Sequence, residues 1–316
     1  MSTPRRHHIL PIAYQKQFMS RPQKIWVFDK KTEKLFETSP KNVSVRRDYN
    51  TALTNEKSLD YGSTEQFFGK NESNYPTTVS ALRSGLQASS ELDQAIQFML
   101  LQAMRSPKAR NLMGDLLLKF SPRGEDQLRS LGVEEAGIEL LRRARAGDKD
   151  AEQKIGLQSS SHFARGLSSI LAQLWYRPIR IESKLKLCSG DGPVLYFGVD
   201  KSRKKLRAGL PVASKRVLCC FPLADDLLLF GDSQKPPVSA FFTDQESQTT
   251  DSLALVKATN TAVSISSEQT VISGDEAALR KAIASSPKQL SPKLLFAHYS
   301  KLGTELLKLN RIRWNN

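Results

Sequence analysis

The sequence predicts an α+β fold in which an N-terminal hairpin and C-terminal strands share a mixed or antiparallel sheet, with a helical middle segment packed on it. Three observations lead to this prediction. Short extended segments occupy residues 1–62, long helical patterns with few β-branched residues fill residues 63–176, and strand patterns return in residues 177–316. Because no internal repeat divides the chain, we expect residues 1–316 to form a single α+β unit.

The first segment contains three short extended patterns. They cover residues 9–14, 24–29 and 35–38. The turn-forming sequence Asp-Lys-Lys-Thr at 29–32 joins the last two, which predicts a hairpin. Two strands alone are not stable in water, so the hairpin needs another layer to cover it.

The middle segment is expected to be mostly helical. Ser89 and Ser90 stand before acidic residues, which is an N-cap signature, and apolar residues then recur at helical spacing up to Met104. Pro107 marks a kink or a restart of this helix. Further helical stretches are expected over residues 112–117, 133–146 and 148–174.

The last segment is expected to return to strands and to end in a helix. The stretch 251–261 can open a helix, and Asp275 is expected to cap a helix that runs to Ile283. Loops are expected at 201–215 and at 233–250. The expected strands are residues 179–187, 194–199, 217–221, 227–230 and 270–273.

The chain is strongly basic. It has 47 Lys and Arg against 32 Asp and Glu, which gives a formal net charge of +15. Such a charge attracts polyanions over long range, so nucleic acid is the first partner to consider and an anionic membrane surface the second. The alternative is that the basic side chains are merely solvated.

The cysteines point to a reducing compartment, and the distribution of apolar residues bears on export and membrane insertion. Cys188, Cys219 and Cys220 are too few and too awkwardly placed for a disulfide framework. The basic N-terminus is not followed by the continuous apolar region of a secretion signal, and no stretch approaches the roughly twenty apolar residues of a spanning helix. We therefore expect a cytoplasmic protein without a transmembrane segment.

A pair of histidines supplies the first catalytic candidate. In an extended segment His7 and His8 point to opposite faces, so one can face the interior and the other solvent. A histidine can act as a base or a ligand near neutral pH, and we assign that role to His8. The alternative is a core histidine that hydrogen-bonds to the backbone beside Pro11 and Tyr14.

Arg105 and Asp191 are the other two candidate catalytic residues. Arg105 belongs to the polar face of the helix after Ser90, where its guanidinium either binds a phosphate or carboxylate or is simply solvated. Asp191 lies between two glycines and before a proline, where an aspartate either caps a tight turn or serves as a metal-binding or acid–base carboxylate. If these residues are functional, His8, Arg105 and Asp191 should converge on one pocket.

Two further patterns bear on nucleic acid. Glu182 and Lys184 have the Glu-x-Lys spacing with which metal-dependent nucleases hold a cation and polarise a water, because alternate side chains of a strand share a face. A basic stretch without acidic residues can contact several phosphates; its alternative is a solvated loop, since no aromatic residues are interleaved for base stacking. The candidate nucleic-acid-binding residues of this stretch are Lys201, Arg203, Lys204, Lys205, Arg207, Lys215 and Arg216.

Several common enzyme classes lack their motifs in this sequence. It has no Gly-x-x-x-x-Gly-Lys phosphate loop, no Gly-x-Ser-x-Gly nucleophile elbow and no Gly-x-Gly-x-x-Gly dinucleotide turn. Zinc-ligand spacing is missing too, since His162 and His298 are isolated. Ordinary nucleotide hydrolases, lipases and dehydrogenases are therefore poor candidates.

Scattered short boxes along the chain resemble a known family. The opening box is His-His-Ile-Leu-Pro at 7–11, followed by Tyr14, and Ser-Gly-Asp-Gly-Pro at 189–193 is similar to a Ser-Asp-x-Pro box. These boxes resemble the family catalogued as domain of unknown function 4238, with Gly190 as an extra residue in the second box. The resemblance implies one architectural unit and brings no activity with it. Further boxes in the family's order are residues 25–30, 40–43, 47–49, Glu65, 102–105, Pro107, 221–223, Asn260 and 271–273.

These patterns leave two functions open. The first is a nucleic-acid-acting protein, a nuclease of a microbial defence or toxin type, for which Mg²⁺ is the cofactor to consider. The second is a non-catalytic interaction protein whose boxes are folding determinants and whose basic stretch docks an acidic protein partner. Removing the side chain of His8 or Asp191 separates the two, because only an enzyme would lose turnover by orders of magnitude while it stayed folded.

Overall fold

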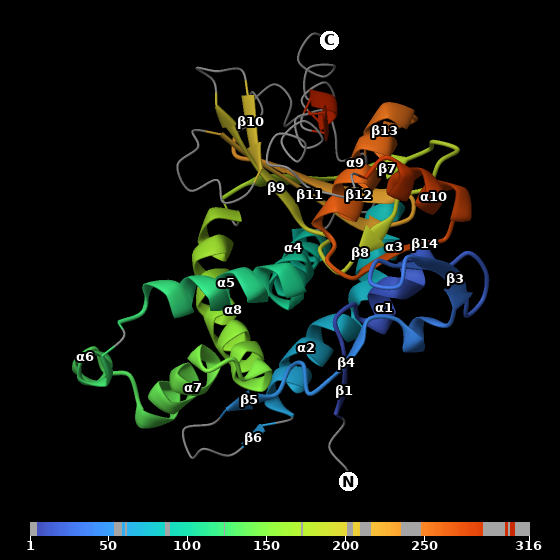
Figure 1. Ribbon diagram of the computed structural model, residues 1–316. Helices are drawn as coiled ribbons and strands as arrows, with labels where there is room; N and C mark the ends of the chain where they lie inside the picture. The colour runs from blue at the N-terminus through green and yellow to red at the C-terminus, as the bar shows by residue number, and fades with distance from the viewer. Residues whose placement is uncertain are drawn as a thin grey trace.

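The computed structural model has the α+β architecture that the sequence predicts, with helices in the middle of the chain and sheets at both ends (Figure 1). None of the helices that it describes is long and apolar enough to cross a membrane. The structure describes residues 5–53, 59–60, 62–85, 89–122, 124–171, 173–200, 205–208, 216–234, 248–286, 301–302 and 304–306.

The hairpin shares a four-stranded antiparallel sheet with strands from the last third of the chain, which confirms the predicted pairing. The strand order is β3-β2-β14-β8. Asp29 shapes the hairpin turn, since its Oδ1 accepts hydrogen bonds from the backbone N–H groups of Lys31 (2.8 Å) and Thr32 (3.2 Å). The strands are β2 (Ile25–Asp29), β3 (Lys34–Thr38), β8 (Ser189–Gly190) and β14 (Thr270–Ser273).

A second, larger sheet has six strands in the order β10-β9-β11-β12-β7-β13. It is mixed, because β13 runs parallel to β7 while its other pairs are antiparallel. Its central strands β11 and β12 are buried along almost their whole length, as expected for strands covered on both faces. The strands are β7 (Trp175–Ile181), β9 (Leu195–Asp200), β10 (Lys205–Ala208), β11 (Arg216–Ala224), β12 (Leu227–Asp232) and β13 (Gln248–Thr250).

Three expectations about strands are wrong. β10 and β13 lie within stretches expected to be loops, but they pair with β9 and β7 and form the two edges of the larger sheet. β7 begins earlier than expected and ends at Ile181, so Glu182 and Lys184 follow the strand and the alternation that would place them on one face does not apply. Residues 9–14 are not extended, because the chain bends at Pro11 into the short helix α1 (Ile12–Gln15).

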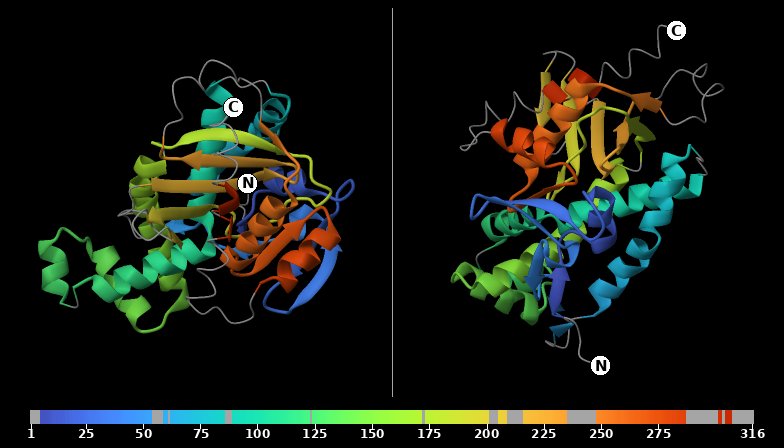
Figure 2. Two further views of the ribbon diagram at one scale, coloured as in Figure 1. Left: turned by 90° about the horizontal axis from the view of Figure 1, so that it is seen from above. Right: turned by 90° about the vertical axis from the view of Figure 1, so that its right-hand side faces the viewer.

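Two helices of the middle segment, α3 and α4, pack on the larger sheet (Figure 2). The Tyr75 hydroxyl of α3 donates to the carbonyl of Leu223 (2.6 Å). Helix α4 begins at Ser89, and α5 restarts at Pro107 as predicted. The helices are α2 (Ser63–Ser73), α3 (Tyr75–Arg83), α4 (Ser89–Arg105), α5 (Pro107–Phe120), α6 (Glu125–Ser130), α7 (Glu135–Arg145) and α8 (Lys149–Leu171).

Short elements complete the fold. Asp275 caps the helix α10 (Glu276–Ala284) as predicted, since its carboxylate accepts the N–H of Ala277 (2.8 Å). The ambiguous stretch after residue 251 is a helix, which Ser252 caps by accepting the N–H of Leu255 (3.2 Å). These elements are β1 (Arg6–His8), β4 (Val45–Arg47), β5 (Ala52–Leu53), β6 (Leu59–Asp60), the 3₁₀ turns Lys16–Phe18 and Pro40–Asn42, α9 (Leu253–Ser266) and α10 (Glu276–Ala284).

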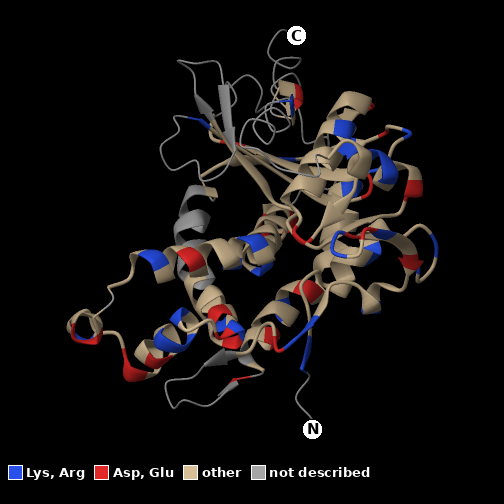
Figure 3. Ribbon diagram, in the orientation of Figure 1, with Lys and Arg blue, Asp and Glu red and all other residues tan. Residues whose placement is uncertain are grey.

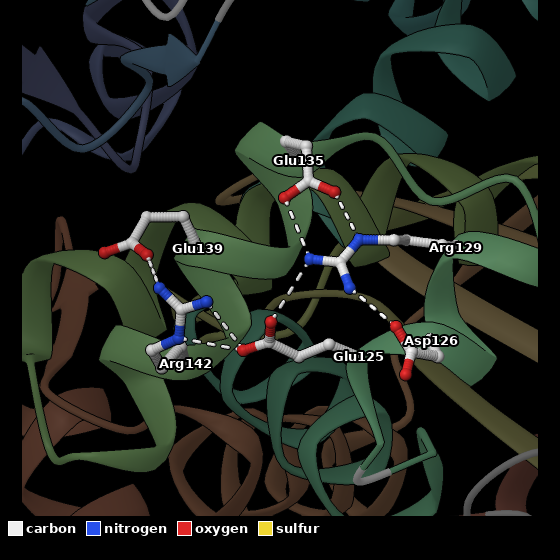
Figure 4. A network of polar contacts seen from close by, with 6 residues as sticks. All are labelled: Glu125, Asp126, Arg129, Glu135, Glu139 and Arg142. Carbon is white, nitrogen blue, oxygen red and sulfur yellow. Dashed lines mark hydrogen bonds and ion pairs between the residues drawn. The ribbon is translucent and has the colours of Figure 1, made fainter.

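One hydrophobic core draws on all three segments of the chain. Tyr14 stacks on Phe221 with ring centroids 5.5 Å apart and lies 5.7 Å from Phe98. A smaller core of its own joins α6, α7 and the start of α8. The outer surface of α6 and α7 carries a network of exposed ion pairs (Figure 4). Its members are Glu125, Asp126, Arg129, Glu135, Glu139 and Arg142.

Candidate functional site

The two histidines of the opening box lie on strand β1, which pairs with β4. His7 is buried, and its Nδ1 accepts a hydrogen bond from the backbone N–H of Asn50 (2.8 Å). His8, on the opposite face of the strand, is only half-buried. His7 therefore has the structural role that a core histidine takes, and His8 is the more accessible of the pair.

His8 is held in one tautomer by the backbone. Its Nε2 lies 3.2 Å from the carbonyl oxygen of Lys41. Because a carbonyl only accepts, Nε2 carries the proton and Nδ1 keeps its lone pair. Burial lowers the pKa of His8, against the opposing attraction of Glu65 and Glu72. The ring is therefore a neutral base at neutral pH.

Helix α2 supplies two carboxylates near His8. Glu65 and Glu72 are two helical turns apart and so share one face of the helix. Glu65 accepts a hydrogen bond from Asn50 Nδ2 (2.5 Å), and Glu72 forms an ion pair with Arg105 (2.5 Å). Each carboxylate is thus fixed by a different part of the chain.

Arg105 ends helix α4 and is almost completely buried. Its guanidinium carbon lies 3.7 Å from the centroid of the Phe68 ring, and burial lowers its pKa against the attraction of Glu72. Within the described part of the chain, its Nε has no hydrogen-bond partner. Its ion-pair partner is Glu72, so Arg105 positions that carboxylate. The residues His8, Asn50, Glu65, Glu72 and Arg105 are called the cluster below.

Tyr49 connects the cluster to a pocket of about 410 Å³ between β4, α5 and α8. Its hydroxyl donates to the carbonyl of Arg105 (2.8 Å). The guanidinium carbons of Arg110 and Arg46 lie 4.0 Å and 5.3 Å from the centroid of its ring. The pocket walls include Arg46, Tyr49, Arg110, Asn111, Lys149 and Glu152.

Asp191 is buried and caps a turn. Its carboxylate accepts hydrogen bonds from the backbone N–H groups of Glu268 (2.8 Å), Gln269 (2.9 Å) and Thr270 (3.3 Å). Burial raises the pKa of Asp191 to about 6, although these hydrogen bonds favour the carboxylate. The three bonds correspond to the turn-capping interpretation of this residue.

The turn that Asp191 holds reaches the pocket. Glu268 accepts hydrogen bonds from Asn111 Nδ2 (2.9 and 3.1 Å), and Gln269 Oε1 accepts one from Arg46 Nε (3.3 Å). Among the described residues, no hydrogen bond or ion pair joins Asp191 directly to His8 or Arg105. The predicted trio is therefore linked through intermediate residues, and Asp191 is not among the residues that line the pocket.

The boxes of the last third make structural contacts. The Tyr14 hydroxyl lies 2.5 Å from Ser189 Oγ and donates to the carbonyl of Pro222 (2.8 Å), while Asn260 Oδ1 accepts the N–H of Cys188 (2.8 Å). The extra residue of the second box is tolerated because it is glycine. A Cβ at Gly190 would lie 2.6 Å from the carbonyl oxygen of Thr270. These boxes fasten helices α1 and α9 to the two sheets.

The predicted basic stretch is only partly described. Lys201, Arg203, Lys204 and Lys215 lie outside the described residues, and the backbone of Lys205 and Arg207 belongs to strand β10. Arg216 pairs with the buried Asp232 through two hydrogen bonds, which ties its charge to the sheet. Elsewhere on the described chain, Lys and Arg are interspersed with Asp and Glu (Figure 3).

Three residues of the cluster and the adjoining pocket were not found from the sequence. They are Asn50, Glu72 and Arg110. Glu72 carries a signal, because it lies seven residues after Glu65 in a helical pattern. Asn50 and Arg110 carry none, since folding alone brings them together. In the described part of the chain, no three His, Cys, Asp or Glu side chains are grouped so that they could hold a metal ion.

A known family covers most of the chain. The family described as protein of unknown function (DUF4238) matches residues 6–277. This range includes both the His-His-x-x-Pro box and the box around Asp191, so the match confirms the resemblance seen in the boxes. No curated protein and no solved structure matches the chain.

Proposed function

Because the chain belongs to the DUF4238 family, whose description gives no activity, we propose a function from the geometry of the site. The protein acts on nucleic acid as a nuclease, with His8 as its acid–base residue. The observation that carries this proposal is the half-buried His8 ring, whose Nδ1 lone pair is set by the Lys41 carbonyl and whose pKa responds to the charges of two fixed carboxylates.

The charge of the chain supports a polyanionic substrate. A formal net charge of +15 draws nucleic acid to the protein over long range. The two arginines beside Tyr49 place cations next to the cluster that contains Glu65 and Glu72. Phosphate groups are thus attracted to the region in which the neutral base lies.

The proposed step is hydrolysis of a phosphodiester. His8 Nδ1 takes a proton from water, and the hydroxide oxygen forms a bond to phosphorus. The bond from phosphorus to the leaving oxygen breaks, and the imidazolium returns its proton to that oxygen. Glu65 and Glu72 stabilise the imidazolium while it is charged, and Arg105 holds Glu72 in place.

A gel assay tests the proposal. Purified protein is incubated with labelled single-stranded RNA, single-stranded DNA and duplex DNA, with Mg²⁺ or with EDTA, at two salt concentrations. We expect cleavage of at least one substrate, and we expect His8→Gln to slow it by about 10²- to 10⁴-fold while the circular dichroism spectrum is unchanged.

Two glutamates on helices serve as a matched pair of variants. Glu65→Gln removes a carboxylate beside His8, whereas Glu276→Gln removes one from α10 that pairs only with Arg280 among the described residues. Cleavage should fall in the first variant and stay at the wild-type rate in the second. Full activity in folded His8→Gln, or no cleavage by the wild type under any condition, would overturn the nuclease proposal.

A second candidate is a non-catalytic interaction protein that docks an acidic partner. It is favoured by the hydrogen bonds that side chains of the boxes form with the backbone. Gln102 Nε2 donates to the carbonyl of Ile9 (2.9 Å), and the Asp191 carboxylate accepts hydrogen bonds from three backbone N–H groups. Such residues are folding determinants. Salt-sensitive binding of nucleic acid or of an acidic protein, without cleavage, would support this candidate instead.

A further inference from the structure

Arg110 is a buried cation whose partners are all neutral. Its guanidinium donates to the carbonyls of Tyr49 (2.6 Å) and Met104 (3.2 Å) and to Asn50 Oδ1 (2.7 Å). Among the described residues no carboxylate forms an ion pair with it. A buried charge without a counterion is costly, and burial accordingly lowers the pKa of Arg110 to about 10, which leaves it charged at neutral pH.

A second cation, Arg46, lines the same pocket and also lacks a counterion among the described residues. Arg46 on β4 is half-buried, and its Nε donates to the neutral amide oxygen of Gln269 (3.3 Å). No ion pair of Arg46 occurs within the described residues either. The guanidinium carbons of Arg46 and Arg110 both lie near the ring of Tyr49, at 5.3 Å and 4.0 Å from its centroid. Two cations without counterions therefore lie near one wall of a hollow.

The charged residues of the pocket lining form no ion pair with these arginines, and Glu65 reaches Arg110 only through Asn50. Lys149 and Glu152 pair with each other (2.7 Å), which leaves Asp115 as the other acidic group of the lining. Asp115 lies at an exposed position of α5, where water screens it. The wall formed by Arg46 and Arg110 is thus positive, and Asp115 on α5 and Glu152 on α8 add carboxylates to the lining.

We infer that this pocket binds a small phosphate monoester, such as a nucleoside or sugar phosphate, with its phosphate at Arg46 and Arg110. The planar guanidinium fork matches phosphate oxygens, and an anion there would supply the counterion that both arginines lack. A volume of about 410 Å³ falls in the range of sites for small ligands. Asp115 and Glu152 can accept hydrogen bonds from the hydroxyl groups of the remainder of the ligand.

This inference goes beyond the proposed nuclease and does not depend on it. The pocket would bind its ligand through Arg46 and Arg110 whether or not His8 cleaves nucleic acid. The two ideas are also tested on different residues and by different readouts.

Isothermal titration calorimetry of the full chain tests the inference. The probes are inorganic phosphate, ribose 5-phosphate and adenosine 5′-phosphate, with adenosine as the uncharged control. The wild type should bind adenosine 5′-phosphate and not adenosine. Arg46→Gln should weaken that binding by about ten- to a hundredfold, since it removes charge-assisted hydrogen bonds.

Arg47→Gln is the matched control. Arg47 is the next residue of β4 and points to the other face of the strand, where its side chain is 71% exposed. The same charge is lost in both variants, so equal weakening by Arg46→Gln and Arg47→Gln would overturn the site. Asn111→Trp, at an exposed position of α5 on the pocket wall, gives a second test by bulk. Binding that survives in this variant, or no binding of any phosphate probe by the wild type at millimolar concentration, would overturn the inference.

Discussion

Arginines in two regions of this molecule have opposite surroundings. On α6 and α7, Arg129 and Arg142 are 44% and 56% exposed, and four carboxylates surround them (Figure 4). At the pocket, Arg110 is 3% exposed and Arg46 is half-buried, and every described partner of either side chain is neutral. In these two regions, counterions accompany the arginines that water already solvates and are missing at Arg110, where desolvation is costly, whereas the buried Arg105 has Glu72 as its counterion.

This difference teaches what each group of arginines does. Exposed ion pairs contribute little to stability and serve mainly to keep a charged surface soluble. A buried cation held only by carbonyl and amide oxygens is retained for a reason other than stability, because an apolar side chain of equal size would avoid its desolvation. Binding of an anion is the reason that the geometry of the pocket supports.

The largest expected effect is on Arg110. Arg110→Ala removes three hydrogen bonds and leaves buried acceptors on Tyr49, Asn50 and Met104 without their donor. We expect the free energy of unfolding to fall by about 3 to 5 kcal/mol. Urea denaturation followed by circular dichroism measures this loss.

Arg110→Met is the control for this variant. Its side chain fills much of the same space and carries no charge, so the loss of stability should be smaller than for Arg110→Ala. Equal losses in the two variants would mean that the lost hydrogen bonds, and not the space that the side chain fills, account for the contribution of Arg110 to stability.

A smaller effect is expected from the titration of Asp191. Its folded-state pKa of about 6 is above the ordinary value of 3.8, so the folded chain holds this proton more tightly than the unfolded chain. The resulting stability is fully present below the unfolded pKa and is lost as the pH rises through about 6. Between pH 4 and pH 7 the fold should lose roughly 2 kcal/mol of stability through this group.

Asp191→Asn isolates that contribution, because an amide does not titrate. The difference in the free energy of unfolding between wild type and variant should change with pH in the direction given above. The exposed network should titrate the other way. Hydrogen bonding to Arg142 lowers the pKa of Glu125, so its contribution is lost as the pH falls. A constant difference between wild type and Asp191→Asn from pH 4 to pH 7 would contradict the raised pKa of Asp191.

Much of the fold could be predicted because its determinants are local in the sequence. The turn at 29–32, the restart at Pro107 and the cap at Asp275 depend on residues within one or two turns of each other. The shared sheet followed from the need to cover an unstable hairpin. Strands β10 and β13 were missed because these short edge strands are specified by pairing with β9 and β7 and not by their own sequence pattern.

The site could be predicted only in part, for the same physical reason. His8, Arg105 and Asp191 stand out as residue types, but their partners come from distant positions in the sequence. Glu72 is the ion-pair partner of Arg105. Gln269, in the turn that Asp191 caps, accepts the hydrogen bond from Arg46. Arg110 gives no signal at all in the sequence. What makes it notable is the absence of a carboxylate partner among the described residues, and that absence exists only after folding.

The smallest expected effect is on Arg129, and it tests the other half of the comparison. Arg129→Ala removes contacts to Glu125, Asp126 and Glu135, yet all four side chains are in water, which solvates the carboxylates that remain. We expect a change in the urea midpoint close to the error of its measurement, and smaller still at high salt, because salt screens the repulsion between those carboxylates. If Arg129→Ala instead destabilised the chain as much as Arg110→Ala, the number of carboxylate partners would govern stability more than burial does. The neutral surroundings of Arg110 would then carry no argument for an anionic ligand.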